Sequence, residues 1–520
     1  MPQRASQIAP VDQNHQSDID KRAGSRTSSR TGTTTRRDLV RTTTFGSIAI
    51  AGSMLIPASA LAHEHATPEA PPTADEVALG QALPLAGVIG EPLRVVPTQE
   101  SVDGVLDITL VADVYEMTVA GKTVRSTGYS ANFPSPTWVV DPGDTIRVHL
   151  TNKLKEVTNL HVHGFHVSPR DNGDNVFIEI KPGETFDYEY QLPDTHPSGI
   201  YWFHPHPHGI SDQQVTSGMV GSILIRGGLD KVQGIEGLKE QSLFIQSTQF
   251  AEDGRQVPLK VLTGSKKMRL VNGQLQPNIS IQPGETQRWR ISNCSGDNFC
   301  LLSLAGHKFF QIAKDGNPFN KVVARDQILL APAERVEVLI QAETKPGTRE
   351  LRQLQWGGIE QVEPDVLIAT MVIEGNPVAT SPLPEQMIPY SDLRNLPIDK
   401  EHVVVFSPAP PPYYQWIDGK PFDPDHIDQK IKLGAVERWT IQNTTDDVHP
   451  FHIHINDFQV IEINGESIDA PSVEDTISIP AHGEVTFLTR FEDFDGKYVF
   501  HCHILMHEDA GMMAIVEVSV

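Results

Sequence analysis

One strand pattern occurs three times along this 520-residue chain and limits it to a repeated β-fold. Each copy has a turn, then alternating apolar and polar residues, then an asparagine. The copies are DPGDTIRVHLTN (141–152), QPGETQRWRISN (282–293) and KLGAVERWTIQN (432–443). A second strand pattern follows each copy, at 180–190, 330–340 and 479–489. Alternating strands between Pro/Gly turns are typical of β-sandwiches, so the repeat predicts three similar sandwiches.

The length of the chain agrees with this division, because 520 residues exceed what one hydrophobic core supports. We predict sandwich domains at 90–228, 238–376 and 395–520. The segments GGLDKVQGIEG and GNPVATSPLPEQ are the predicted linkers.

Histidines recur in pairs separated by one residue. The pairs are His161/His163, His204/His206, His452/His454 and His501/His503. On a strand, each pair directs two imidazoles to one face. A single pair is more often two ordinary histidines. Four pairs supply eight imidazoles, however, and converging imidazoles suit a cluster of several copper ions.

The segment from His501 to Met512 contains a second kind of ligand set. Cys502 lies between two histidines, and His507 and Met512 follow. One Cys, two His and a weak Met are the ligands of a blue-copper site, and His449 can supply the second imidazole. Strand alternation directs Cys502 away from its two neighbours. The segment therefore predicts two metal centres joined covalently through Cys502.

The middle copy of the repeat lacks these histidines. Where the first and third copies are followed by the histidine motifs, the second is followed by SNCSGDNFCLLSLAGH, with only His307. We therefore expect the middle domain to be a spacer without copper. The cluster should form between the first and third domains, each giving four imidazoles.

The four motifs, in this order, resemble those of the multicopper oxidases, over nearly all of the chain beyond its leader. The resemblance implies three cupredoxin-like (plastocyanin-like) Greek-key domains. It also implies that single electrons from a reductant are used to reduce O2 to water. The expected cofactors are four copper ions: one type 1, one type 2 and two type 3.

The same resemblance assigns the copper ligands position by position. The type 1 ligands would be His449, Cys502, His507 and axial Met512, with His507 as the electron entry. The type 2 ligands would be His161 and His452. The type 3 ligands would be His163, His204 and His503 on one ion and His206, His454 and His501 on the other. The histidines that match no ligand position, which we interpret as ordinary, are His166, His208, His307 and His482.

Two acidic residues lie where the family has acids near the cluster. Glu508 follows His507, and Asp174 lies a short loop beyond LHVHG. Carboxylates are suitable proton relays, and O2 reduction needs protons. Each could equally be a structural hydrogen-bond acceptor.

The substrate is less constrained than the chemistry. The HED-x-GMM ending resembles the bacterial laccase and bilirubin oxidase branch, which implies a phenol, an aromatic amine or a similar donor. An alternative is a metallo-oxidase of Cu(I), Fe(II) or Mn(II), with Glu508 and Asp509 as candidate carboxylates. Only 10 methionines and no Met-rich run weaken the Cu(I) version. A remote alternative is a non-enzymatic exported scaffold, although such relatives lose the copper ligands that this chain retains.

The N-terminus predicts export. Residues 1–37 are rich in Ser, Thr and Arg, as expected for disorder. Arg36 and Arg37 precede an apolar stretch at 45–61, and Ala60-Leu61-Ala62 resembles a cleavage signal. We expect residues 1–62 to be a twin-arginine signal peptide and leader, read by that export machinery, and the protein to be periplasmic or extracellular. A chance arginine pair and a retained anchor are the alternatives.

Charge, hydrophobic patterning and cysteine content argue against nucleic-acid-binding, membrane-inserted and disulfide-rich proteins. The net charge of −24 argues against nucleic acid or an anionic membrane surface as a partner. No apolar stretch is long enough for stable membrane insertion. Three cysteines do not make a disulfide framework, although an oxidising compartment would allow a Cys294–Cys300 bond. We expect a monomer whose partners are a small-molecule or metal-ion reductant and O2.

Overall fold

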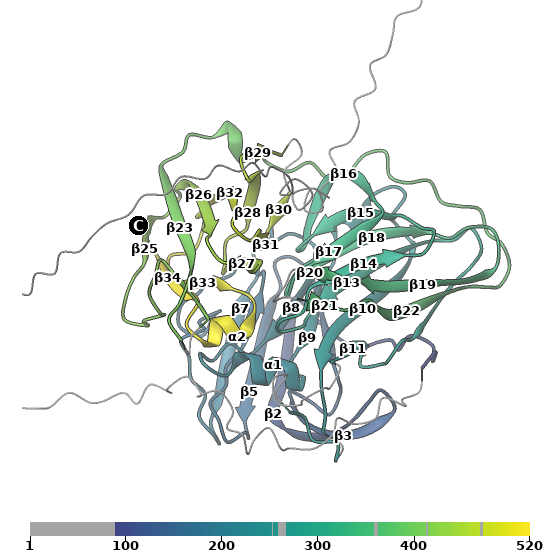
Figure 1. The fold of residues 1–520 in the computed structure, drawn as a ribbon, viewed down its shortest axis with the longest axis horizontal. Coiled ribbons are helices and arrows are strands. Elements are labelled where there is room, and N and C mark those ends of the chain that lie inside the picture. Colours follow the sequence, from purple (N-terminus) through teal and green to yellow (C-terminus); the bar gives the residue numbers. More distant parts are fainter. Residues whose placement is uncertain (1–88, 252, 258–266, 358–361, 412–413, 469–471) are drawn as a thin grey trace, which may run out of the picture. The chain divides into compact units, whose positions relative to one another are not determined.

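The computed structural model describes residues 89–251, 253–257, 267–357, 362–411, 414–468 and 472–520 (Figure 1). Within these ranges the regular structure is almost entirely β-strand, and the strands form three successive two-sheet units. The predicted all-β fold of three sandwiches is therefore confirmed. No helix in the described ranges is long and apolar enough to span a bilayer. The predicted leader, residues 1–62, lies outside the described residues.

The strands of the first sandwich lie between residues 98 and 225, and the short 3-10 helix η2 follows them. The elements of this sandwich are β1 (Thr98–Glu100), β2 (Val105–Val119), β3 (Lys122–Gly128), β4 (Ser135–Val140), β5 (Thr145–Asn152), β6 (His161–His163), β7 (Thr185–Gln191), β8 (Gly199–His204), α1 (Ser211–Ser217), β9 (Gly221–Ile225) and η2 (Gly228–Lys231). The two sheets have the orders β1-β4-β9-β8-β6 and β3-β2-β5-β7. Their inner faces share one core, which includes Trp138, Ile146 and Phe203.

The second sandwich lies within 238–376. Its elements are β10 (Lys239–Thr248), β11 (Met268–Val271), β12 (Asn278–Ile281), β13 (Thr286–Asn293), β14 (Cys300–Leu304), β15 (Phe309–Lys314), β16 (Asn317–Arg325), β17 (Gln327–Leu330), β18 (Arg335–Gln341), β19 (Gly347–Leu354), β20 (Trp356–Gly357), β21 (Val362–Glu363) and β22 (Val366–Ile373). The sheets are β11-β10-β13-β18-β15-β16 and β12-β22-β19-β14-β17. Cys294 and Cys300 are buried here as free thiols, so the disulfide that the sequence allowed is not formed.

The strands of the third sandwich lie between residues 400 and 519, and the short 3-10 helix η3 precedes them. The elements of this sandwich are η3 (Leu393–Asn395), β23 (Lys400–Pro408), β24 (Gln415–Ile417), β25 (Gln429–Lys432), β26 (Val436–Asn443), β27 (His449–Ile453), β28 (Phe458–Ile463), β29 (Glu466–Ser467), β30 (Val473–Glu474), β31 (Thr476–Ile479), β32 (Glu484–Arg490), β33 (Gly496–Cys502), α2 (Leu505–Asp509) and β34 (Met513–Ser519). One sheet has the order β24-β23-β26-β32-β28-β29, with β30 beside β28, and the other β25-β34-β33-β27-β31.

The sequence repeat corresponds to the same neighbouring strands in every sandwich. The first pattern becomes β5, β13 and β26, and the second becomes β7, β18 and β32. In each sandwich the two strands pair antiparallel. Each first-pattern strand also pairs parallel with an earlier strand, namely β2, β10 or β23. The repeat thus encodes the centre of one sheet three times.

The asparagine that ends each copy performs the same structural task. Asn293 is fully buried, and its amide donates to the backbone oxygens of Asn298 and Leu330 while its side-chain oxygen accepts the N–H of Ser295. Asn152 and Asn443 make the equivalent bonds in the other sandwiches. A buried amide that satisfies three backbone groups fixes the turn leaving the strand.

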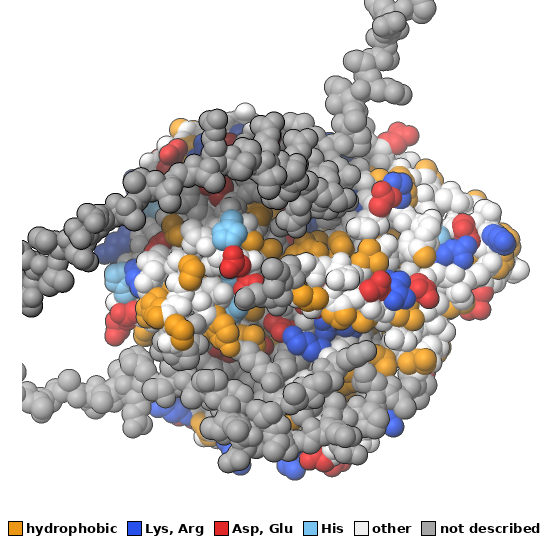
Figure 2. Space-filling model, viewed as in Figure 1, with side chains coloured by type: hydrophobic (Ala, Val, Ile, Leu, Met, Phe, Trp, Pro, Cys, Tyr) orange, Lys and Arg blue, Asp and Glu red, His pale blue; other side chains and the backbone are white. Residues whose placement is uncertain are grey.

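The surface of the described residues carries both signs of charge. On the face shown in Figure 2, acidic and basic side chains are interspersed rather than gathered into one field. The negative net charge is therefore not concentrated in a single patch on the described part of this face.

The buried asparagine predicts a stability effect that is separate from any metal chemistry. Replacing Asn293 by Ala leaves buried backbone groups without partners, so we expect the free energy of unfolding to fall by about 2–4 kcal/mol. Urea unfolding measures the change. The matched control is Asn278→Ala, which removes a more exposed bond to Gly90 and should cost under ~1 kcal/mol. Equal midpoints for the two variants would contradict the role assigned to Asn293.

Candidate metal centre

Strand pairing brings the histidine motifs together within each outer sandwich. In the first sandwich, β6 pairs with β8, so that His161 lies opposite His204. In the third, β27 pairs with β33, so that His452 lies opposite His501. The ring centroids within the four pairs are 5.0–6.0 Å apart. All eight rings are buried.

Not every paired histidine lies on a strand. Only β6 holds both members of its pair, since β8, β27 and β33 end before the second histidine. The second rings are held by other contacts: the backbone N–H of His206, for example, donates to Asn159 Oδ1 at 2.6 Å. The pairs still converge, because each lies at a strand end that faces the opposite sandwich.

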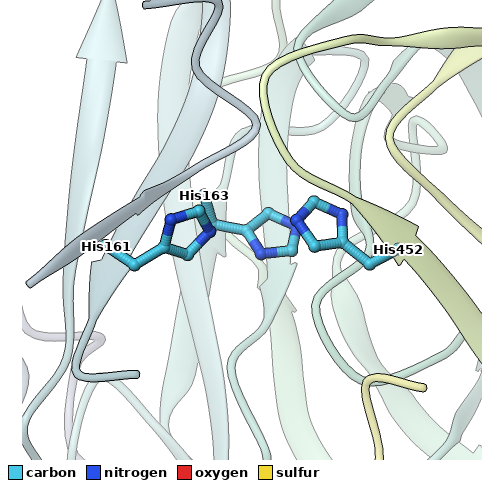
Figure 3. Close-up of side chains that lie close together, drawn as sticks. All are labelled: His161, His163 and His452. Atoms are coloured by element: carbon cyan, nitrogen blue, oxygen red, sulfur yellow. The ribbon is translucent and has the colours of Figure 1, made fainter. Parts of the chain in front are cut away.

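Rings of the first and third sandwiches meet to form three groups. Figure 3 shows one of them, with His161 and His163 on the strand of the first sandwich and His452 reaching toward them from the third. The other two groups are His163, His204 and His503, and His206, His454 and His501. In every group the ligand atoms lie within 4.8 Å of one another. The last two groups are the same triplets that the resemblance assigned to the type 3 ions.

Several ring nitrogens in these groups have no hydrogen-bond partner although they are buried. They include Nε2 of His161, His204 and His452, Nδ1 of His163 and both nitrogens of His503. In the third group, Nε2 of His206 and Nε2 of His454 each lie 3.2 Å from Nε2 of His501. Two lone pairs facing one nitrogen cannot both be satisfied by a single N–H. Metal ions would satisfy them, so the residues present fit copper.

Contacts on the far side of the rings orient the open nitrogens. Nδ1 of His204 donates to Pro205 O at 2.9 Å, and Nδ1 of His452 donates to Asp475 O at 2.7 Å. Nδ1 of His161 lies 2.9 Å from both carboxyl oxygens of Asp174. His163 is turned the other way, with Nε2 3.0 Å from Asp475 Oδ1. Outer contacts of this kind fix the tautomer and direction of metal-binding histidines.

Burial keeps these rings neutral. It lowers the pKa of His204 to about 3 and that of His206 to about 4, with neighbouring imidazoles acting in the same direction. The pKa of His161, His163, His452, His454 and His503 falls well below 6.5 for the same reason. Neutral imidazole is the form that binds metal.

A second group lies on the other side of Cys502. Its Sγ is 3.4 Å from Nδ1 of His449 and 3.8 Å from Nδ1 of His507. Nε2 of His449 is 2.8 Å from the hydroxyl of Thr445, which leaves Nδ1 toward the sulfur. Burial raises the pKa of the Cys502 thiol, so a metal is needed to hold it as thiolate.

Met512 and Met513 pack in different hydrophobic clusters, as strand alternation predicts. Met512 is fully buried in the core that contains Cys502, and its backbone oxygen accepts the N–H of Cys502 at 3.1 Å. Met513 packs in a different cluster with Val499 and Ile515, as expected for a residue on the opposite face. His507 is 7% exposed, and its ring centroid is 5.6 Å from that of the exposed Tyr414.

The two predicted acids lie beside the histidine cluster. Asp174 is buried against His161 and accepts the N–H of Val162, and burial raises its pKa to about 8. Glu508 is fully buried, 3.1 Å from Nδ1 of His501 and 3.4 Å from Nδ1 of His206. Burial raises the pKa of Glu508, but these two histidines outweigh burial and lower it overall.

Sequence reasoning missed Asp475, which contacts two histidines of the cluster. Asp475 lies between β30 and β31, immediately before the strand that pairs with β27. It is buried and also binds Arg335 of the middle sandwich. Only the β27–β31 register brings it to the cluster, and that register is not readable from the local pattern.

The histidines interpreted as ordinary have ordinary contacts. His166 lies near Asp493 and Ile455 O, His307 near Ala305 O, and His482 near Asp446. The ring of His208 lies 5.0 Å from that of Phe422. None of these four belongs to a metal-binding group among the described residues.

Comparison with known proteins gives one consistent family. Models described as multicopper oxidase match residues 112–229, 237–351 and 396–520. A multicopper oxidase of Staphylococcus aureus is 28% identical over 423 residues, or 77% of this chain and 85% of that protein. A laccase of Bacillus subtilis is 25% identical, over 76% of this chain and 90% of the laccase.

Solved structures agree. A multicopper oxidase from Campylobacter jejuni, described as a metallo-oxidase, superposes with a TM-score of 0.75 at 28% identity. The match covers 84% of this chain and 97% of that one.

The neutral buried rings predict acid sensitivity of the metal-free protein. The pKa of His449 and of His204 is about 3 in the folded state because of burial, against about 6.5 when unfolded. Below pH 6.5 the unfolded chain binds protons that the folded chain excludes, so stability is lost as the pH falls. Each such histidine contributes up to ~1.4 kcal/mol per pH unit. Urea midpoints measured from pH 7 to pH 5 should fall steeply; a flat profile would contradict neutral burial.

Proposed function

The chain belongs to the multicopper oxidase family, and we propose that this copper-dependent oxidoreductase oxidises a phenol, an aromatic amine or a similar small reductant and reduces O2 to water. The observation that carries the proposal is the junction at Cys502. Its sulfur faces one ligand group, while its flanking histidines face the three-group cluster. One covalent segment therefore connects a site for single electrons to a site able to collect several.

We assign four copper ions to these groups. His449, Cys502, His507 and Met512 would hold the type 1 ion, and His161 and His452 the type 2 ion. The two type 3 ions would use the triplets His163, His204, His503 and His206, His454, His501. When bound, copper would supply the one-electron transfers and the reduction of O2.

The protein contributes position and exclusion of water. His507 lies closest to the surface of the Cys502 group, so the reductant is expected to dock there, beside Tyr414. The remaining ligands of both sites are buried, so bulk water would be excluded from the reaction.

We assign proton transfer at the cluster to Glu508 and Asp174. Glu508 touches histidines of one triplet, His206 and His501, and Asp174 touches His161 of the neighbouring group. A carboxylate that is buried at hydrogen-bonding distance from a cluster ligand would be able to hold and release a proton close to the cluster.

A metallo-oxidase is the second candidate. The Campylobacter jejuni structure is described by that activity. Asp423 and Asp425 are exposed on a segment whose Phe422 N–H donates to Gly511 O at 3.0 Å, one residue before Met512. Such carboxylates suit a metal-ion donor near the type 1 site.

The carboxylates named from the sequence for that alternative are less suitable. Glu508 is fully buried, so it is not a surface ligand. Asp509 accepts the backbone N–H groups of Ser211 and Asp212 at 2.9 Å, which caps the start of α1.

Export through the twin-arginine route to the periplasm or beyond also stays a proposal. It is supported by the Arg36–Arg37 pair and the apolar stretch that follows. This route carries folded proteins, so copper could be loaded before export.

Oxygen consumption by the copper-loaded protein tests the function. A phenol, Cu(I) and Fe(II) are supplied separately, and we expect uptake with the phenol at least. Cys502→Ser should abolish both the blue absorption band and the uptake, because the thiolate is lost. Absence of uptake with all three reductants at full copper loading would refute the oxidase proposal, and a blue C502S protein would refute the ligand assignment.

Glu508→Gln tests the proton assignment. The amide keeps the shape and an acceptor oxygen but cannot cycle a proton, so turnover with O2 should fall by about 10²–10⁴-fold. Anaerobic reduction of the blue band by the donor should keep its wild-type rate, since that step does not use Glu508. The copper content is the control. Slowed anaerobic reduction or lost copper would show a structural role instead.

A further inference from the structure

We propose that Arg335, from the middle sandwich, is a positioning residue for the copper cluster. It acts through Asp475, which holds one histidine of the first sandwich and one of the third. The inference rests on the proposed function, because it concerns the same cluster. It changes the role of the middle sandwich from a spacer to a part of the site.

Arg335 joins all three sandwiches at one buried point. It begins β18 and is 0% exposed. Its Nη1 and Nη2 donate to Asp475 Oδ1 and Oδ2 at 2.8 and 2.6 Å, a two-point bond to the third sandwich. Its Nε donates to Ile200 O of the first sandwich at 3.3 Å. A planar guanidinium in this fork fixes the carboxylate in both position and rotation.

Asp475 passes that constraint to two rings. Its Oδ1 accepts from Nε2 of His163 at 3.0 Å, and its backbone oxygen accepts from Nδ1 of His452 at 2.7 Å. The opposite nitrogens, Nδ1 of His163 and Nε2 of His452, are the ones left without a partner. The orientation of both open nitrogens therefore depends on where Asp475 is held.

The packing around this contact leaves little room for another arrangement. Gly164 follows His163 with φ +83, and a Cβ there would lie 2.4 Å from Asp475 Oδ2 and 2.6 Å from Arg335 Nη2. Arg335 is also held from behind, since its own N–H donates to Asp315 Oδ1 at 2.8 Å. The guanidinium is held within the middle sandwich as well, because its Nη1 donates to Ala333 O at 3.2 Å.

Removal of the guanidinium would leave the buried Asp475 carboxylate without the two-point bond that holds it, which favours its movement. That movement alters the bond to His163. Outer partners of metal-binding histidines typically contribute 10–100-fold in metal affinity. The proposal therefore predicts that correct packing of the middle sandwich is required for tight binding at the cluster but not at the Cys502 site.

The test compares Arg335→Met with Lys314→Met. Lys314 is a matched control, because it is a partly buried cation of the middle sandwich and pairs with Glu474 of the third at 2.6 Å, next to Asp475 in the sequence. Copper retention against a competing chelator is measured together with the blue band and the electron paramagnetic resonance of the type 2 copper. We expect R335M to keep the blue band, change the type 2 spectrum and lose cluster copper about 10–100-fold more readily. K314M should retain wild-type copper and spectra.

The outcomes separate the inference from the function. Wild-type copper retention and spectra in R335M, or equal losses in R335M and K314M, would overturn the positioning role. If R335M does not fold, Arg335→Lys and Asp475→Asn decide. R335K, which keeps the charge but not the fork, should show a smaller loss of the same kind, and D475N a similar spectral change; wild-type behaviour of both would overturn the proposal. A wild-type protein that binds copper but consumes no O2 would sink the proposed oxidase, not this inference.

Discussion

Eight imidazole rings buried between two sandwiches present lone pairs that the protein itself does not satisfy. Burial lowers the pKa of His161 and of His454 well below the usual range, and neighbouring rings act in the same direction. Several of these buried ring nitrogens have no hydrogen-bond partner among the described residues, and a metal ion would supply the missing partner. Such a site stabilises the packed sandwiches when it is filled and weakens them when it is empty. The protein must therefore hold these rings in place through other contacts.

Carboxylates and backbone oxygens on the outer sides of the rings provide these contacts. Asp174 holds His161, Asp475 holds His163 and His452, and Glu508 lies against His501. Each of these carboxylates contacts the outer side of a ring and so helps to fix its direction. These carboxylates lie on segments far apart in the chain, and Asp475 also binds Arg335 of the middle sandwich. The geometry of the cluster therefore depends on how the sandwiches pack, including the one that contributes no histidine to it.

Local rules were sufficient for much of this. The alternation of strand residues separates Cys502 from His501 and His503, and it separates Met512 from Met513, without any knowledge of the fold. The threefold repeat likewise predicted the three sandwiches, because a turn, an alternating strand and a final asparagine form a local pattern that can be recognised in the sequence. These inferences held because a period of two residues and a turn depend only on neighbours in the chain.

The sequence alone determined the fold class, and it predicted which histidines and which cysteine come together, since these inferences follow from residue types at short spacing. Tertiary structure decided the rest. It brought Asp475 to the cluster through the β27–β31 register, and it buried Glu508 instead of exposing it as a surface ligand. It also placed Arg335 against Asp475, which is 140 residues away in the chain. Contacts between distant segments depend on how whole sheets pack, and no local pattern encodes that packing.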